Sequence, residues 1–266
     1  MSRIRLLSTD FDGTLIGHPS DGRCSPAFAT ALRSHHAQGG LWAVNTGRGL
    51  DHMDEGVEIF SPPVRPDFAL VLEREVYRRT AHGWEPYGEW NAVCRRRHAE
   101  LFREAGEVFA LIEEMAAASD NTITVVYEDD VPTGLVTTDE EVMEALTERL
   151  RPLADRHPQF NYQRNFIYLR FCHCDYHKGA ALGELCRLED IPREEVFAVG
   201  DHYNDLSMLD GVHAGMTACP ANAIELVKET VRKSNGYVAE KPWADGVAEA
   251  LDFYRSRQGQ PDGVCV

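Results

Sequence analysis

The sequence predicts an α/β protein with a doubly wound, parallel-sheet core of the Rossmann-like kind and an inserted α+β domain. Short apolar runs alternate with helical segments in the first and last parts of the chain, which is typical of a parallel sheet covered by helices. The middle of the chain has helices and strands of its own. Acidic and polar residues directly follow several predicted strands, which places the candidate site at the carboxyl edge of the sheet.

The composition is that of an ordinary soluble globular protein, with 266 residues, 43% hydrophobic and 26% charged. One large domain or two are expected at this length. A formal net charge of −16 argues against nucleic acids and anionic membranes as partners. It would also repel a phosphorylated substrate unless a bound metal and local basic residues reverse the sign at the site.

The cellular location is expected to be the cytoplasm. The 7 cysteines have no regular spacing, which favours reduced thiols over a disulfide framework. No stretch has the apolar length of a membrane span, and the first residues lack the apolar core of a signal peptide. No oligomeric state is predicted.

The first part of the chain alternates between predicted strands and helices. Ser25 and Pro26 mark a helix start, and Gly39 and Gly40 mark its end. The predicted strands cover residues 3–9, 41–45, 67–72 and 75–79, and the predicted helices cover 26–38 and 50–60.

The insert is expected at residues 81–171 and the core domain at 1–80 and 172–266. Within the middle block we expect a helix at 91–119 that can break at Gly106, strands at 122–127 and 134–137, a helix at 138–156 and strands within 159–174. The core then resumes with helices at 178–187, 221–231 and 244–255, and with strands at 196–199 and 212–215.

Asp10 and Asp12 directly follow the first predicted strand, and Gly13 lets the chain turn sharply behind them. Two carboxylates at this spacing repel each other unless a cation or a shared proton relieves the repulsion. At the end of a strand, such a pair indicates a divalent metal and acid–base chemistry. An acidic turn without a function is the alternative, because Asp and Gly are favoured turn residues.

Four further polar residues fall at strand ends or at a helix start: Thr46, Lys178, Asp201 and Asp205. They can converge with Asp10, because the carboxyl ends of parallel strands share one edge. Metal-assisted phosphoryl transfer needs such a set: a nucleophile, a metal clamp, an acid–base group and donors for the phosphoryl oxygens. Each also has an ordinary explanation: a capping threonine, a solvated lysine and helix-capping aspartates.

Four short motifs occur in a fixed order: D-F-D-G-T-L at 10–15, N-T-G-R at 45–48, H-K-G at 177–179 and G-D-H-Y-N-D at 200–205. With them, the sequence resembles the haloacid dehalogenase (HAD) superfamily of phosphatases. The long stretch between the second and third motifs is similar in position and size to the α/β cap of the Cof-like and sucrose-phosphate-phosphatase-like branches.

The resemblance implies the following chemical roles. Asp10 attacks phosphorus and forms an aspartyl-phosphate, while Asp12 protonates the leaving oxygen and then activates water. Thr46 and the amide of Gly47 hold phosphoryl oxygens. Lys178 offsets the negative charge of Asp10 and of the phosphoryl group.

The resemblance also implies a Mg²⁺ site formed by Asp10, the backbone carbonyl of Asp12, Asp201 and Asp205. Asp201 is the direct ligand of the fourth motif, and Asp205 orients the waters of the metal. Asn204 would reach the phosphate or the metal shell, and Arg48 would either face the substrate or form a structural ion pair. In the family context, the residues assigned to the substrate are Thr46, Gly47, Arg48, Lys178 and Asn204.

The implied activity is a Mg²⁺-dependent phosphatase for a small phosphorylated metabolite, with a sugar phosphate favoured. A phosphosugar mutase and a non-catalytic phosphorylation-switch or binding module are the alternatives. The charged turn at 72–75 departs from many relatives, which have small residues there. The candidate leaving-group contacts in the insert are Tyr162, Arg164, Asn165, Tyr168 and Arg170.

The run Cys172-His173-Cys174 is interpreted as strand packing. It contains metal-ligating residue types, but it lacks the second ligand pair of a zinc site.

Overall fold

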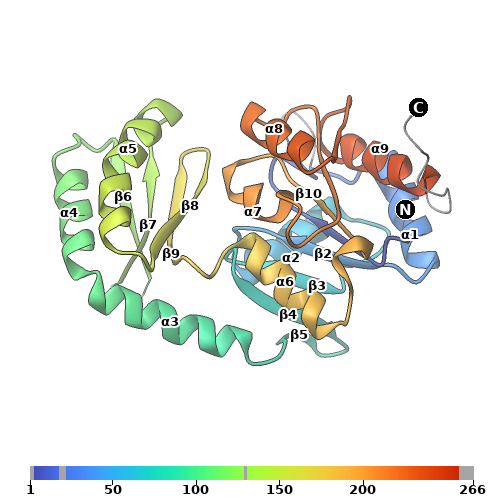
Figure 1. Cartoon of the computed structure of the whole chain (residues 1–266), viewed down its shortest axis with the longest axis horizontal. Helices are drawn as coiled ribbons and strands as arrows, with labels where there is room; N and C mark the ends of the chain where they lie inside the picture. The colour runs from blue at the N-terminus through green and yellow to red at the C-terminus, as the bar shows by residue number, and fades with distance from the viewer. Residues whose placement is uncertain (1–2, 18–21, 129–130, 258–266) are drawn as a thin grey trace. The chain divides into compact units, whose positions relative to one another are not determined.

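Figure 1 shows the computed structural model of the chain, which describes residues 3–17, 22–128 and 131–257. The chain divides into two compact units, one of Met1–Asn91 with Lys178–Val266 and one of Ala92–His177. The boundaries differ from the expected 80/81 and 171/172 because the chain after Thr80 continues the first unit's sheet. At the other end, the last strand of the second unit runs to His173.

The sheet of the first unit has 8 strands among the described residues, in the order β12-β11-β10-β1-β2-β3-β4-β5. The strands from β12 to β3 are parallel, and β4 and β5 add an antiparallel hairpin at one edge. The bounds are β1 Leu6–Thr9, β2 Leu41–Asn45, β3 Phe68–Val71, β4 Glu75–Thr80, β5 Gly83–Pro86, β10 Val196–Val199, β11 Met216–Cys219 and β12 Tyr237–Val238.

Helices cover both faces of this sheet, which confirms the predicted doubly wound core. Adjacent residues of β1 show the division, because Leu6 packs into one apolar cluster and Leu7 into the other. The cluster of Leu7 includes α1 Pro26–Ala37, α2 Leu50–Phe60 and α9 Trp243–Ser256. The cluster of Leu6 includes α6 Lys178–Leu188, α7 Leu206–Leu209 and α8 Glu225–Lys233.

The register of the central strands brings three motifs to one edge. Thr9 at the end of β1 pairs with Val199 of β10 and with Val44 of β2. Asp10 and Gly200 directly follow this paired level, and Thr46 follows Asn45, the last residue of β2, so all three leave neighbouring strands at the same edge of the sheet.

The strand predicted at 212–215 is wrong, because the chain there forms a bend. Gly211 has a φ of 86°, and the side chain of Val212 is 60% exposed. The strand that pairs with β10 begins at Met216, directly after the predicted one. An apolar run beside a glycine turn does not reveal which residues of the run join the sheet.

The second unit contains a 4-stranded antiparallel sheet in the order β6-β7-β9-β8. Helices α3 Trp90–Glu104, α4 Gly106–Ala117 and α5 Glu140–Arg156 contribute to its apolar cluster, and the predicted break at Gly106 is confirmed. The strands are β6 Ile123–Glu128, β7 Val131–Thr137, β8 Phe160–Asn165 and β9 Tyr168–His173.

The chain leaves the first unit after Asn91 and returns to it at Lys178, and the core forms hydrogen bonds with both residues. Asn91 Oδ1 accepts a hydrogen bond from the amide of Val76 at 2.7 Å, and Asn91 Nδ2 donates to the Val76 carbonyl at 2.9 Å. The carbonyl of Lys178 accepts a hydrogen bond from Asn45 Nδ2 at 3.1 Å. Among the described residues, no helix is both long enough and apolar enough to span a membrane.

We predict that His35 makes the stability of the first unit dependent on pH. Burial lowers the pKa of His35 to about 4, while its Nε2 is hydrogen bonded to the carbonyl of Leu41 at 2.9 Å. In the unfolded chain His35 binds a proton below the ordinary histidine pKa of about 6.5, whereas in the folded protein it does so only near pH 4. Its contribution to the free energy of unfolding is therefore full above pH 6.5 and is lost as the pH falls toward 4. From pH 7.5 to 5 we expect a loss of roughly 2 kcal/mol.

Denaturant unfolding of wild type and His35→Gln at both pH values measures the contribution of His35 to the pH dependence of the free energy of unfolding. The variant should lose less stability between the two pH values than wild type does. His36→Gln is the matched control, because His36 is exposed on the same helix. Equal pH dependence in wild type and His35→Gln would contradict the prediction.

Candidate active site

A buried lysine lies between two carboxylates at the carboxyl edge of the sheet. Lys178, the first residue of α6, donates from Nζ to Asp10 Oδ1 and to Asp205 Oδ1, both at 2.6 Å. The Lys178 side chain is 0% exposed and Asp10 is 2% exposed. Burial alone lowers the pKa of Lys178, but the carboxylates of Asp10 and Asp205 outweigh it and hold the pKa above its usual value. The ammonium group is therefore the fixed positive charge of this site.

Asp201 and Asp205 belong to one tightly bonded loop that follows β10. Asp205 Oδ2 accepts hydrogen bonds from the amides of Asp201 and His202, at 2.8 and 2.9 Å. Asp201 Oδ1 accepts a hydrogen bond from Thr14 Oγ1 at 2.6 Å. The first motif thus contributes Thr14 as well as its aspartates, a contact that the sequence analysis missed.

The carboxylates of Asp10, Asp201 and Asp205 fit a divalent cation. One oxygen from each lies within 4.8 Å of the others, and all three residues are buried. Burial raises the pKa of Asp10 well above its usual value against the opposing charge of Lys178. Burial and the Asp205 carboxylate raise the pKa of Asp201 to about 7. A hard cation bound by these oxygens would offset the repulsion that raises both values.

Asp12 lies outside this cluster and forms an ion pair with Arg48. The guanidinium donates from Nε to Asp12 Oδ2 at 2.7 Å and from Nη2 to Asp12 Oδ1 at 2.6 Å. These bonds, more than any other contribution, raise the pKa of Arg48. The pair is partly exposed, with 29% of the Arg48 side chain accessible, and the assignment of Arg48 to the substrate stays a prediction.

The second motif and the turn after β3 form another wall of the site. Thr46 is 1% exposed, and its carbonyl accepts a hydrogen bond from the amide of Glu73 at 3.0 Å. The Glu73 side chain then reaches Asn204, whose Nδ2 donates to Glu73 Oε1 at 3.0 Å. The charged turn was visible in the sequence, but Glu73 was not predicted as a site residue. The only sequence signal was its position just past a strand end.

Comparison with known families identifies the chain. The model of a family described as haloacid dehalogenase-like hydrolase matches residues 106–251, more than half of the chain. The chain belongs to the haloacid dehalogenase-like hydrolase family. The resemblance drawn from the four motifs is therefore confirmed.

Two curated relatives of this HAD-like hydrolase are phosphoglycolate phosphatases from archaea. The protein of Methanosarcina acetivorans is 34% identical over 79 residues, which is 30% of this chain and 32% of the relative. The protein of Methanobrevibacter smithii is 37% identical over 77 residues, which is 29% of this chain and 30% of the relative. The chain thus aligns with about a third of the length of these curated relatives.

Solved structures share the fold over almost the whole chain. The sucrose-phosphatase from Synechocystis sp. PCC6803, in complex with sucrose and phosphate, has a TM-score of 0.68 and 17% identity, covering 96% of this chain and 99% of that one. BT1666 from Bacteroides thetaiotaomicron, a phosphatase of the same superfamily, has a TM-score of 0.63 and 20% identity, covering 95% and 96%. At these identities the likeness concerns the fold.

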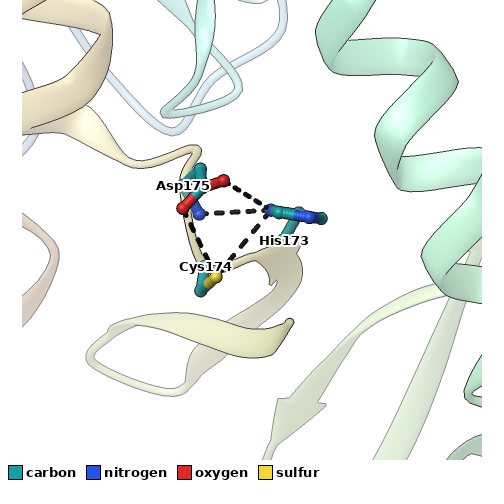
Figure 2. Close-up of side chains that lie close together, drawn as sticks. All are labelled: His173, Cys174 and Asp175. Atoms are coloured by element: carbon teal, nitrogen blue, oxygen red, sulfur yellow. Dashed lines mark hydrogen bonds and ion pairs between the residues drawn. The ribbon is translucent and has the colours of Figure 1, made fainter. Parts of the chain in front are cut away.

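A second cluster of metal-ligating residue types lies in the second unit of this HAD-like hydrolase. Figure 2 shows His173, Cys174 and Asp175, which follow one another at the end of β9. Their polar atoms bond to one another: the Asp175 amide donates to His173 Nδ1 at 3.2 Å, and Cys174 Sγ donates to Asp175 Oδ1 at 3.5 Å. The His173 ring also packs against Tyr176, with centroids 5.5 Å apart. The interpretation of Cys172-His173-Cys174 as strand packing stays a prediction.

The candidate residues of the insert differ in their surroundings. Arg164 is 9% exposed and forms an ion pair with Glu144 of α5. Tyr162 packs against the apolar cluster that α5 shares. Tyr168 is 58% exposed and pairs across the hairpin with Asn165, while Arg170 pairs with Gln163. Tyr168 and its neighbours are therefore better placed than Arg164 or Tyr162 to meet a ligand.

Proposed function

We propose that the protein is a Mg²⁺-dependent phosphatase that hydrolyses a small phosphorylated metabolite through an aspartyl-phosphate on Asp10. The observation that carries the proposal is the buried arrangement in which Lys178 bridges Asp10 and Asp205 beside Asp201. A buried carboxylate can act as the nucleophile on an anionic phosphoryl group when a fixed cation and a cluster of metal-binding carboxylates lie beside it.

The reaction proceeds in two steps. An oxygen of Asp10 attacks phosphorus, the bond from phosphorus to the leaving oxygen breaks, and Asp12 gives the leaving oxygen a proton. Asp12 then takes a proton from water, which attacks phosphorus and breaks the bond to Asp10, so that inorganic phosphate leaves. Arg48 holds Asp12 in place between these transfers, as its two hydrogen bonds to the carboxylate support.

The remaining assigned residues bind the phosphoryl oxygens and the metal. Thr46, the amide of Gly47 and Asn204 donate hydrogen bonds to the phosphoryl group, and Lys178 offsets its charge. Asp10, Asp201 and the backbone carbonyl of Asp12 would hold Mg²⁺, and Asp205 would orient the waters of the metal. Bound Mg²⁺ supplies charge neutralisation for the phosphoryl oxygens.

The proposed substrate is a sugar phosphate, and phosphoglycolate is the second candidate. The fold shared with a sucrose-phosphatase supports the first, and the sequence similarity to phosphoglycolate phosphatases supports the second. We further propose that the unit Ala92–His177 acts as the cap that selects the leaving group.

Phosphate release from an aryl phosphate, phosphoglycolate and a panel of sugar phosphates tests the proposal. We expect release that requires Mg²⁺ and stops with EDTA, because the acidic cluster repels a phosphoryl group unless a cation is bound. Mg²⁺ should also raise the melting temperature of wild type but not of Asp201→Asn. No release from any substrate by folded, Mg²⁺-loaded protein would contradict the proposal. Isomerisation of a phosphosugar without release would favour a mutase.

A further inference from the structure

Glu73 places a buried carboxylate beside the catalytic groups. It lies in the turn between β3 and β4, 5% exposed, and its Oε1 accepts a hydrogen bond from Asn204 Nδ2 at 3.0 Å. Asn204, which is 1% exposed, belongs to the short 3-10 helix Tyr203–Asp205. One hydrogen bond thus joins two segments of the site that lie 131 residues apart in the sequence.

The backbone of this turn does not favour a glutamate. Leu72 and Glu73 have φ values of 52° and 64°, in the left-handed region that side chains other than those of Gly, Asn and Asp rarely adopt. A glycine would form the same turn without strain. The turn itself therefore does not explain a glutamate at this position. The hydrogen bond from Asn204 to its side chain does, which indicates a role in the site.

A carboxylate at this place determines which way the neighbouring amide faces. An ionised carboxylate only accepts hydrogen bonds, so the NH₂ group of Asn204 faces Glu73 and its carbonyl oxygen does not. One N–H is used in this contact and the other remains. Asn204 Oδ1 is buried and has no hydrogen-bond partner among the described residues, so no other contact of the carbonyl fixes the amide.

We propose that Glu73 is a positioning residue that holds the Asn204 carboxamide with its second N–H available to a phosphoryl oxygen. The inference rests on the proposed function, in which Asn204 contacts the phosphoryl group. Without the carboxylate, the amide can turn and present its oxygen, which repels phosphoryl oxygens. Gly47 lies close to the same carboxylate oxygen: a Cβ added there would be 2.9 Å from Glu73 Oε1. The turn therefore lies against two of the groups assigned to phosphate.

A double-mutant cycle in steady-state kinetics tests whether Glu73 acts through Asn204. We expect Glu73→Met and Asn204→Ala each to raise KM about tenfold, with a smaller change in kcat, since each removes one charge-assisted or phosphate-facing hydrogen bond. The double variant should lose no more than Asn204→Ala alone. Glu73→Gln keeps an acceptor oxygen and should recover part of the loss. Single losses that multiply to about a hundredfold would overturn the proposal.

Thermal unfolding of the same four proteins separates this inference from the proposed function. The melting shifts of Glu73→Met and Asn204→Ala should fall short of additivity by roughly 2 °C, whatever the protein hydrolyses. Glu89→Met is the matched control, because Glu89 is exposed in the same unit, and it should show no coupling to Asn204→Ala. Coupling in melting without any phosphate release would reject the proposed function alone. Additive melting shifts would overturn the positioning role.

Discussion

Asp10→Asn should lower phosphate release by at least about 10⁴-fold, because the substitution replaces the carboxylate of the proposed nucleophile with an uncharged amide. The substitution keeps the shape of the side chain and an oxygen that can accept the 2.6 Å hydrogen bond from Lys178. It also removes a buried carboxylate whose pKa is raised by burial and, to a smaller extent, by the neighbouring carboxylates of Asp205 and Asp201. We therefore expect the variant to fold and to melt within a few degrees of wild type.

Phosphate release under saturating Mg²⁺, together with thermal unfolding, measures both effects. Asp252→Asn is the matched control, since Asp252 is exposed on α9, and it should retain wild-type turnover. Residual activity of Asp10→Asn within about a hundredfold of wild type would exclude Asp10 as the nucleophile.

The second large effect concerns stability. Lys178→Met leaves the carboxylates of Asp10 and Asp205 buried without their shared cation. Removing one partner of a buried ion pair costs about 3–5 kcal/mol, which corresponds to a fall of roughly 10 °C in melting temperature for a chain of this size. Activity should be lost as well, because the phosphoryl group then meets uncompensated negative charge.

The origin of this loss can be checked by adding a second substitution. Lys178→Met with Asp10→Asn contains one buried carboxylate fewer, so we expect it to melt at a higher temperature than Lys178→Met alone. Lys228→Met serves as the control for an ordinary lysine of the same unit. If Lys178→Met melts within about 2 °C of wild type, Lys178 does not compensate these carboxylates.

The sequence predicts the part of the site that depends on strand ends. Asp10 and Thr46 could be placed because each follows a short apolar strand, and the edge of a parallel sheet brings such residues together. Lys178 is predicted at a helix start, and Asp205 is predicted in the segment that follows the strand at 196–199. Their direct contact depends on how α6 begins beside the loop after β10, which no periodicity indicates.

Other parts of the structure depend on interactions that sequence patterns do not show. Glu73 is buried because a left-handed turn directs its side chain to Asn204, whereas a charged turn residue is ordinarily exposed. The pairing of Arg48 with Asp12 is likewise a contact between two motifs that neither motif indicates by itself. The strand expected at 212–215 was displaced by the bend at Gly211, and β5 joined the core sheet through hydrogen bonds to β4.

The way in which the core holds residues 91 and 178 has a consequence for the evolution of such proteins. Asn91 is hydrogen bonded to both backbone groups of Val76, and Lys178 is held by its side chain and its carbonyl. All of these bonds lie within the core, so none of them depends on what the chain does between the two residues. A lineage can therefore replace or reshape the inserted segment while these contacts of the core are inherited intact. The same two positions are the natural junctions for building chimaeras with inserts from other members of the family.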